Sequence, residues 1–162
     1  MNRGSLDELR QIVERESYEG ALLLQNPGDN PICRLRYDEE VRCVEVTWRR
    51  YATSAQLRYI HEMILSLLAQ HKAEKILGDD ADLPIVHAED QRWIVEEWLP
   101  RARATGLKVA ATTLSMTFFG RVAISAIQSQ LSRELQIRNF GSIHAARSWL
   151  KNLSPGARSQ AC

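Results

Sequence analysis

The sequence has no hydrophobic run long enough to span a membrane. Near its start the longest apolar run is "ALLL", Ala21–Leu24, whereas a membrane-spanning helix needs about 18 or more apolar residues. The first twenty residues carry scattered charges and lack the apolar core of a secretory signal. We therefore expect a cytoplasmic protein without a membrane span.

The sequence also lacks an excess of charge of either sign. Its 162 residues include 21 Lys and Arg and 20 Asp and Glu, for a formal net charge of +1. Nucleic-acid-binding domains usually carry a basic surface, so no nucleic-acid partner is expected. The short basic clusters "WRRY" and "RARATGLK" are typical of a solvated surface. The length and the hydrophobic content of 44% fit one globular domain.

Cysteine is scarce, and its spacing excludes the common metal and redox motifs. Cys33, Cys43 and Cys162 form no CxxC pair, and no histidine lies at metal-ligand spacing from any of them. A disulfide between Cys33 and Cys43 is unfavourable on geometric grounds. If Leu35 pairs with Val44 in a hairpin, the apolar residues share one face and Cys43 points to the other. We therefore expect reduced thiols, as is usual in a reducing compartment.

Several catalytic and cofactor-binding motifs are absent. The sequence has no GxSxG nucleophile elbow, no GxGxxG dinucleotide motif and no GxxxxGK(S/T) phosphate loop. The eight glycines are scattered along the chain and do not cluster in a phosphate-binding turn. These absences predict a protein that is not an enzyme and that needs no cofactor.

The first half of the sequence contains helix-like and strand-like patterns. An amphipathic pattern over residues 5–16 predicts a short N-terminal helix. Two alternating runs, Ile32–Tyr37 and Val41–Arg49, flank a polar turn and predict a β-hairpin. Residues 54–71 predict a long amphipathic helix that begins with a capping box at Thr53.

Strands and helices then alternate to near the C-terminus. Strands are predicted at 75–79, 107–114 and 135–140, and helices at 88–105, 115–134 and after Ser142. Pro100 is unfavourable inside a helix, because proline removes a backbone hydrogen bond. The pattern predicts an α/β fold, in which a mixed sheet has an antiparallel N-terminal hairpin, later parallel strands, and helices packed on it.

Three stretches of the sequence resemble the STAS-like proteins, which are related to the anti-sigma-factor antagonists (SpoIIAA-like). These stretches are "RYDEEVRCVEVTWRR", "EKILGDDADLPIVHAEDQRWIVEEWLPRARATGLKVAAT" and "IRNFGSIHAARSWL". The resemblance covers about residues 30–152 and is in particular to the uncharacterised stand-alone bacterial branch. It implies a STAS-like domain at residues 21–153, with an N-terminal helical extension at 1–20 and a disordered tail at 154–162.

This resemblance implies a binding function. STAS-like domains bind protein partners, in some cases under the control of phosphorylation, and certain lipid-transfer domains share their architecture. The antagonists that are switched by phosphorylation carry Ser or Thr just after a strand that ends in Asp. In this sequence no hydroxyl side chain occurs between Gly78 and Thr105. The phosphorylation switch is therefore not expected here.

The acidic stretch after the predicted strand at 75–79 has two interpretations. Asp79, Asp80 and His87 are residue types that bind metal ions. Their spacing matches neither an EF-hand loop nor an HxxxH pair, and acids such as Asp90 suit the first turn of a helix. We prefer this second, structural interpretation and expect no metal site. His87 is the histidine best placed to act as a base, because it lies in a loop beside carboxylates.

An apolar segment follows the predicted strand at 107–114. Because consecutive parallel strands end at the same edge of a sheet, this segment and the acidic loop are expected to be neighbours. The predicted binding surface comprises Asp79, Asp80, His87, Met116, Phe118 and Phe119. The primary hypothesis is a non-enzymatic domain that binds a protein partner or a second copy of itself. The alternative is a domain that binds a small apolar or lipid-like ligand between residues 115–131 and the sheet, and an enzyme is the third.

Overall fold

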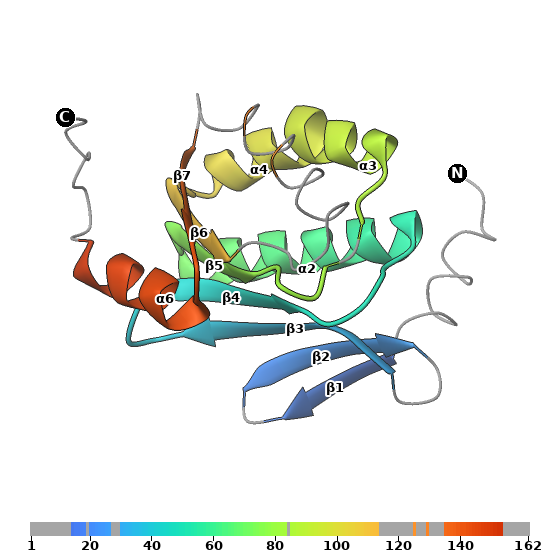
Figure 1. The fold of residues 1–162 in the computed structure, drawn as a ribbon, viewed down its shortest axis with the longest axis horizontal. Helices are drawn as coiled ribbons and strands as arrows, with labels where there is room; N and C mark the ends of the chain where they lie inside the picture. The colour runs from blue at the N-terminus through green and yellow to red at the C-terminus, as the bar shows by residue number, and fades with distance from the viewer. Residues whose placement is uncertain are drawn as a thin grey trace.

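The strands of the protein form one mixed sheet (Figure 1). The computed structural model describes residues 14–18, 20–26, 30–83, 85–113, 125, 129 and 135–153. The strands are β1 (Glu14–Tyr18), β2 (Ala21–Asn26), β3 (Asn30–Asp38), β4 (Cys43–Trp48), β5 (Lys75–Asp79), β6 (Val109–Thr113) and β7 (Gln136–Phe140). They lie side by side in sequence order, from β1 at one edge to β7 at the other.

The direction of the strands changes halfway across the sheet. Strands β1 to β4 pair in antiparallel fashion, whereas β4 to β7 are parallel. Tight turns suffice for antiparallel neighbours, but parallel neighbours need a longer connection, which helices supply. The predicted α/β class, with an antiparallel N-terminal hairpin and later parallel strands, is confirmed.

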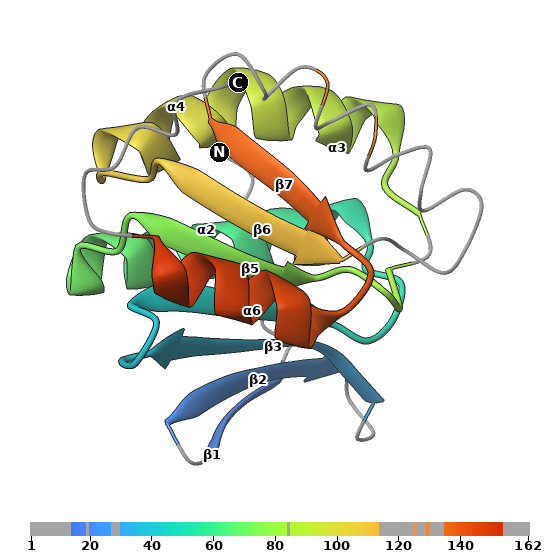
Figure 2. The ribbon, with the colours of Figure 1, turned by 60° about the vertical axis from the view of Figure 1, so that its left-hand side comes forward.

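Helices cover both faces of this sheet (Figure 2). They are α2 (Ser54–His71), α3 (Ala88–Trp93), the π-helical turn η1 (Ile94–Trp98), α4 (Leu99–Ala104) and α6 (Ile143–Asn152). Figure 2 shows α6 in front of β5 and β6, with the other helices behind the sheet. None of the helices within the described residues is both long and apolar enough to cross a membrane.

The two faces of the sheet have separate apolar cores because side chains alternate along each strand. On β4, Val44 and Val46 belong to the larger core under α2, α3 and α4. Their neighbour Cys43 belongs to the smaller core under α6, together with Leu77 of β5. Both cysteines of the hairpin, Cys33 and Cys43, are free.

The hairpin register differs from the predicted one by two residues. Leu35 pairs with Val46, and Val44 pairs with Tyr37. A shift of two residues keeps each side chain on its face, so Cys33 and Cys43 still belong to different cores. The reason for expecting free thiols therefore holds, although the predicted pairs were wrong.

The prediction for the N-terminus needs a correction. Residues 14–16 were expected to end a helix, but Glu14–Tyr18 forms strand β1, which pairs with β2. Pairing with β2 places this segment in the sheet instead of in a separate helical extension. Residues 5–13 of the predicted helix, the predicted helix at 115–134 apart from residues 125 and 129, and the tail at 154–162 lie outside the described residues.

The helix predicted at 88–105 is interrupted in a way that accommodates Pro100. The amide of Leu99 donates to the carbonyl of Ile94, five residues earlier, which is a π-helical bond. Pro100 follows in the first turn of α4, where a missing amide proton breaks no helical hydrogen bond. The wide turn therefore divides one predicted helix into α3, η1 and α4 without a loop.

Two helix starts follow the predicted local signals. Thr53 and Gln56 form a capping box at the start of α2, with the Thr53 hydroxyl accepting from the Gln56 amide at 3.3 Å. Ser142 caps α6 by accepting from the amide of Ala145 at 3.2 Å. These caps position α2 and α6 on opposite faces of the parallel strands.

Candidate functional site

The carboxyl end of β5 sends two adjacent acids to opposite faces of the sheet. Asp79 faces the α6 side, where its Oδ1 accepts from the hydroxyl of Thr113 at 3.0 Å. The amide of Asp80 donates to the same hydroxyl oxygen at 3.0 Å. Thr113 therefore holds the backbone at this point, and the side chain of Asp80 turns to the α2 side.

Asp80 lines a pocket of about 150 Å³ between the sheet and the helices α2 and η1. A cavity of this size holds a ring about as large as benzene. Strands β4 to β7 form its floor, with Val46, Ile76, Ala110 and Ile137. Ile76, Ala110 and Ile137 lie at matching positions of adjacent strands, and Val46 faces the same side because it lies two residues after Val44, the partner of Ile76.

Helices and loops form the remaining walls of the pocket. The helical wall consists of Leu57, His61 and Ile64 of α2 with Ile94 and Trp98 of η1. Trp48, Leu83, Val86, Leu107 and Leu135 complete it. Gly78 keeps room at the floor, because a Cβ at this position would lie 3.2 Å from Cγ2 of Thr112. The pocket is therefore apolar apart from the side chains of Asp80, His61 and Thr112.

The apolar surroundings change the acidity of Asp80. Removal from water, together with the charge of Asp79, raises the pKa of the Asp80 carboxyl group to about 7. Within the part of the chain that is described, no Lys or Arg forms an ion pair with Asp80. A carboxyl group in an apolar pocket with a strongly raised pKa is a common feature of functional sites.

His61 is the second ionisable group of the pocket. Its Nδ1–H donates to the carbonyl of Leu57 at 2.9 Å, and burial lowers its pKa to about 4. The imidazole is therefore neutral at physiological pH, with its lone pair on Nε2. Trp98 packs edge-on against this ring at a centroid distance of 5.0 Å, and Trp48 lies at 6.1 Å.

His87, by contrast, lies apart from this pocket. It is exposed at the start of α3, and its ring nitrogen Nε2 lies 3.2 Å from the hydroxyl of Tyr51. No hydrogen bond between described residues joins His87 to Asp79 or Asp80. Among the described residues no group of three or more His, Cys, Asp or Glu side chains is arranged to hold a metal ion. The three predicted polar residues therefore point in three different directions.

Asp90, in the first turn of α3, is buried, and both of its carboxylate oxygens accept hydrogen bonds. Its Oδ2 accepts from the hydroxyl of Ser54 at 2.5 Å, and its Oδ1 accepts from Nε of Arg58 at 3.0 Å. Only 1% of the residue is exposed. Asp90 therefore joins the first turn of α3 to the start of α2, which is a structural role.

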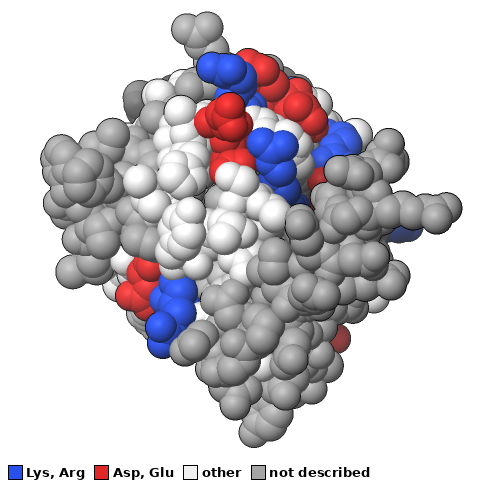
Figure 3. All heavy atoms as spheres, turned by 90° about the vertical axis from the view of Figure 1, so that its right-hand side faces the viewer, with Lys and Arg blue, Asp and Glu red and all other residues white. Residues whose placement is uncertain are grey.

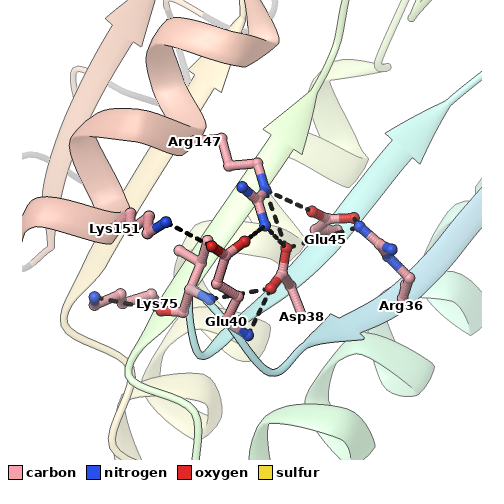
Figure 4. Close-up of polar contacts among 8 residues, drawn as sticks. Arg36, Asp38, Glu40, Glu45, Lys75, Arg147 and Lys151 are labelled. Atoms are coloured by element: carbon pink, nitrogen blue, oxygen red, sulfur yellow. Dashed lines mark hydrogen bonds and ion pairs between the residues drawn. The ribbon is translucent and has the colours of Figure 1, made fainter.

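A larger polar cluster lies on the other face and fixes α6 (Figure 4). Arg147 of α6 donates to Asp38 at 2.6 Å and to Glu40 at 2.7 Å, at the turn between β3 and β4. Lys151 also donates to Glu40, at 2.5 Å, and Arg36 donates to Glu45. The positive and negative charges of this cluster neutralise one another. The cluster is therefore best explained as structural, because its ion pairs hold α6 against the sheet; we call it the α6 fastening.

Lys75 of β5 also holds α6 against the sheet. Its Nζ donates to the carbonyl oxygens of Leu150 at 2.7 Å and Leu153 at 3.0 Å, where α6 ends. A cation at this end also favours the helix dipole. Burial lowers the pKa of Lys75, although the neighbouring Cys43 and Glu74 act in the opposite direction.

The described charges on one side of the molecule are mixed in sign. Figure 3 shows positive and negative side chains next to each other at the level of α3, above an area without charged residues. One ion pair of the loop after β5 joins Asp82 to Arg49 at 3.7 Å. Such mixed charges produce no strong field of one sign over the part of this face that is described.

Three of the six predicted site residues, Met116, Phe118 and Phe119, lie outside the described residues. The pocket instead draws on residues that were not among the predicted site residues, above all His61, Trp48 and Trp98. His61 could have been identified from the sequence as a site residue, because it is a polar residue on the apolar face of the long helix. For the two tryptophans, no local pattern separates a pocket wall from an ordinary core position.

Comparison of the chain with protein-family models, with curated proteins and with solved structures found no match. The resemblance to STAS-like proteins therefore stays a prediction.

Proposed function

We propose that this protein is a non-enzymatic binding domain that holds a small apolar ligand in the pocket between β4–β7 and the helices α2 and η1. The pocket of about 150 Å³ is the observation that supports this proposal. A ligand there would contact aromatic and aliphatic carbon from both the sheet and the helices. Transfer of apolar ligand surface from water to such walls provides about 25 cal/mol per Å².

The walls of the pocket favour binding because they are ordered in the protein without a ligand. Ile64 of α2, Trp48 of β4 and Trp98 of η1 are each at most 5% exposed, so neighbouring side chains restrict their rotation. The indole Nε1 of Trp98 donates to the carbonyl of His61 at 2.8 Å, which fixes this ring further. Pre-formed walls reduce the entropy lost on binding.

Titration with small uncharged compounds tests this proposal. Toluene and benzyl alcohol are added to the full chain while the methyl NMR signals of Leu57, Ile64 and Ile76 are followed. We expect saturable shifts of these signals, confined to residues that line the pocket. Absence of saturable binding up to millimolar concentrations, for these compounds and for benzylamine alike, would contradict the proposal.

A substitution that fills the pocket, compared with the same substitution on the surface, tests whether the ligand binds in the pocket. Ala110→Leu adds side-chain atoms on the pocket floor, whereas Ala55→Leu makes the same change on the exposed side of α2. We expect Ala110→Leu to weaken binding of benzyl alcohol at least tenfold and Ala55→Leu to leave it unchanged. Equal affinity in both variants would place the ligand elsewhere.

The interaction function that was predicted first, with a protein partner or a second copy, is not excluded by this proposal. Strand β7 favours it as a second candidate, because β7 lies at the edge of the sheet as described and can accept another strand. Sedimentation across a range of protein concentrations tests for self-association. Phe119→Asp changes the predicted surface and not β7, so loss of association in this variant would favour that surface, whereas unchanged association would favour the β7 edge.

A further inference from the structure

We propose that the ligand of this pocket carries a protonated amine on a small apolar skeleton, and that the amine pairs with the carboxylate of Asp80. This inference rests on the proposed function and narrows it to one class of ligand. It follows from the polar groups of the pocket, which offer hydrogen-bond acceptors to a ligand and lack a donor to pair with Asp80.

Asp80 is the one acid among the pocket-lining residues that are described. Its sequence neighbour Asp79 is satisfied on the opposite face by Thr113. No hydrogen bond or ion pair from another described side chain reaches the Asp80 carboxyl group. Gly78 has no side chain to crowd it, whereas a Cβ there would lie 3.5 Å from Oδ1 of Asp80, and Asp80 itself lines the pocket. A ligand atom in the pocket can therefore approach this carboxyl group.

The other polar groups of the pocket do not supply a partner for Asp80. The hydroxyl of Thr112 donates to Oδ1 of Asn139 at 2.7 Å, and the indole N–H of Trp98 donates to a backbone carbonyl. His61 donates through Nδ1 to Leu57, so the neutral ring offers only a lone pair at Nε2. Ionised Asp80 and neutral His61 both accept hydrogen bonds. The complementary ligand group is consequently a donor.

The charge and the aromatic walls favour a cationic donor over a neutral one. A carboxylate removed from water gains most from a partner of opposite charge. Trp48 and Trp98 line the pocket, and a cation over the face of an indole ring gains about 0.5–2 kcal/mol in proteins generally. A ligand carboxylate or phosphate would be repelled by Asp80. These features select an amine over an acid.

The size of the pocket limits the skeleton that carries the amine. A volume of about 150 Å³ corresponds to about one six-membered ring, so a ring with a one- or two-carbon aminoalkyl chain matches it. Larger amines, such as those on a long lipid chain, exceed this volume. Benzylamine and cyclohexylamine are suitable probes because they differ in aromaticity and not in charge.

Calorimetry of the full chain at pH 8 provides the test. Benzylamine is compared with benzyl alcohol, which has nearly the same shape and no charge. We expect benzylamine to bind at least tenfold more tightly. Equal affinities would overturn the amine assignment and leave the proposed function intact, whereas no binding of either compound would contradict both.

Two substitutions at adjacent residues separate the charge of Asp80 from a general effect of negative charge. Asp80→Asn is expected to reduce the affinity for benzylamine at least tenfold and to leave that for benzyl alcohol unchanged. Asp79→Asn, which removes a charge that contributes to the raised pKa of Asp80 but leaves the pocket lining intact, is expected to reduce the affinity for benzylamine less than Asp80→Asn does and to leave that for benzyl alcohol unchanged. An unchanged preference for the amine in Asp80→Asn would overturn the inference.

The wild-type protein offers a second measurement, which does not depend on how the variants fold. Because the amine requires ionised Asp80, its binding at pH 6 should release a proton, detected by calorimetry in two buffers of different ionisation enthalpy. The titratable groups near Asp80 are His61, which lines the same pocket, Cys33, and Asp79 on the opposite face of the sheet, whose charge reaches it. His61 and Cys33 are uncharged at this pH, since the pKa of His61 is about 4 and burial raises that of Cys33. Absence of proton release would contradict pairing with Asp80.

Discussion

The carboxylate of Asp90 on α3 lies 3.0 Å from Nε of Arg58 on α2. The two helices start at separate points of the chain, and this pair holds their first turns together. Asp90 is 1% exposed, whereas the side chain of Arg58 keeps 42% of its surface in water. The pair is therefore asymmetric: loss of Arg58 leaves a buried charge, and loss of Asp90 leaves a cation that water can solvate.

This asymmetry predicts the effect of substitutions at the pair. Asp90→Ala removes two hydrogen bonds to a buried carboxylate and should lower the free energy of unfolding by about 2–3 kcal/mol. Arg58→Ala should cost at least as much, because Asp90 keeps its charge in a buried position. Urea denaturation of each variant measures these changes. Glu89→Ala, an exposed acid of the same turn, should stay within about 0.5 kcal/mol of the wild type.

The contact of Lys75 with the end of α6 predicts a local loss of stability. Lys75→Met keeps most of the side-chain volume and removes the donor to the carbonyls of Leu150 and Leu153. We expect a loss of about 1–3 kcal/mol, the usual cost of unsatisfied buried polar groups. Amide hydrogen exchange should accelerate in α6 before it does so in α2. The exposed Lys72 is the control, and Lys72→Met should change neither measurement.

The two ionisable groups of the pocket predict opposite dependences of stability on pH. The pKa of Asp80 rises from 3.8 to about 7 on folding, so its contribution to the free energy of unfolding decreases as pH increases from 4 to 7. The pKa of His61 falls from 6.5 to about 4, so its contribution decreases as pH is lowered through that range. In the wild type the two effects largely cancel.

Substitution of Asp80 or His61 alone should reveal the pH dependence of stability that each group contributes. Relative to the wild type, Asp80→Asn should gain up to about 4 kcal/mol between pH 4 and pH 7. His61→Phe should gain up to about 3 kcal/mol as the pH is lowered from 6.5 to 4. Chemical denaturation at intervals of half a pH unit measures both differences. Parallel curves for wild type and Asp80→Asn would show that Asp80 titrates normally in the folded protein.

Asp38 predicts the behaviour of the α6 fastening in acid. Burial alone would raise the pKa of Asp38, but hydrogen bonds from the Val41 amide and from Arg147 outweigh it and hold the pKa below 3.8. The stability that this carboxylate contributes is complete above pH 3.8 and is lost as pH falls through the lower, folded value. Asp38→Asn should therefore cost about 1–2 kcal/mol at pH 7.

The same substitution should cost less in acid, because the wild-type carboxylate loses its own stabilising contribution as pH falls below 3.8 through the folded value. Thermal unfolding at pH 7 and pH 2 measures the change. Glu39→Gln, at the exposed neighbouring position, is the control and should show no pH-dependent difference. A cost for Asp38→Asn that is equal at both pH values would mean that the ion pair with Arg147 contributes little.

The local features of this protein were predictable from short stretches of sequence. Thr53 and Ser142 cap helices in the described structure because their hydroxyls reach amides only three residues away. The alternation along β3 and β4 placed Cys33 and Cys43 on different faces even though the predicted register was wrong. Such signals depend on neighbours in the chain, and the α/β class follows from their order.

Other features depended on residues far apart in the chain. The predicted helix at 5–16 failed at Glu14, which forms a strand because β2 provides a pairing partner. A weak helical pattern does not outweigh a complete ladder of strand hydrogen bonds. The π turn before Pro100 was also not predicted, since a proline signals an interruption but not the form that the interruption takes.

The candidate site also combines features that follow from the local sequence with features that depend on tertiary contacts. The sequence by itself determined that Asp79 and Asp80 end a strand, and adjacent strand residues must leave opposite faces. Only the tertiary structure decided that one face has Thr113 as a partner and the other a pocket. That pocket depends on the shapes of side chains from β4 to β7 and from α2 and η1, which meet only after folding. Its size and the acidity of Asp80 are properties of this packing, because burial and distance from water exist only in three dimensions.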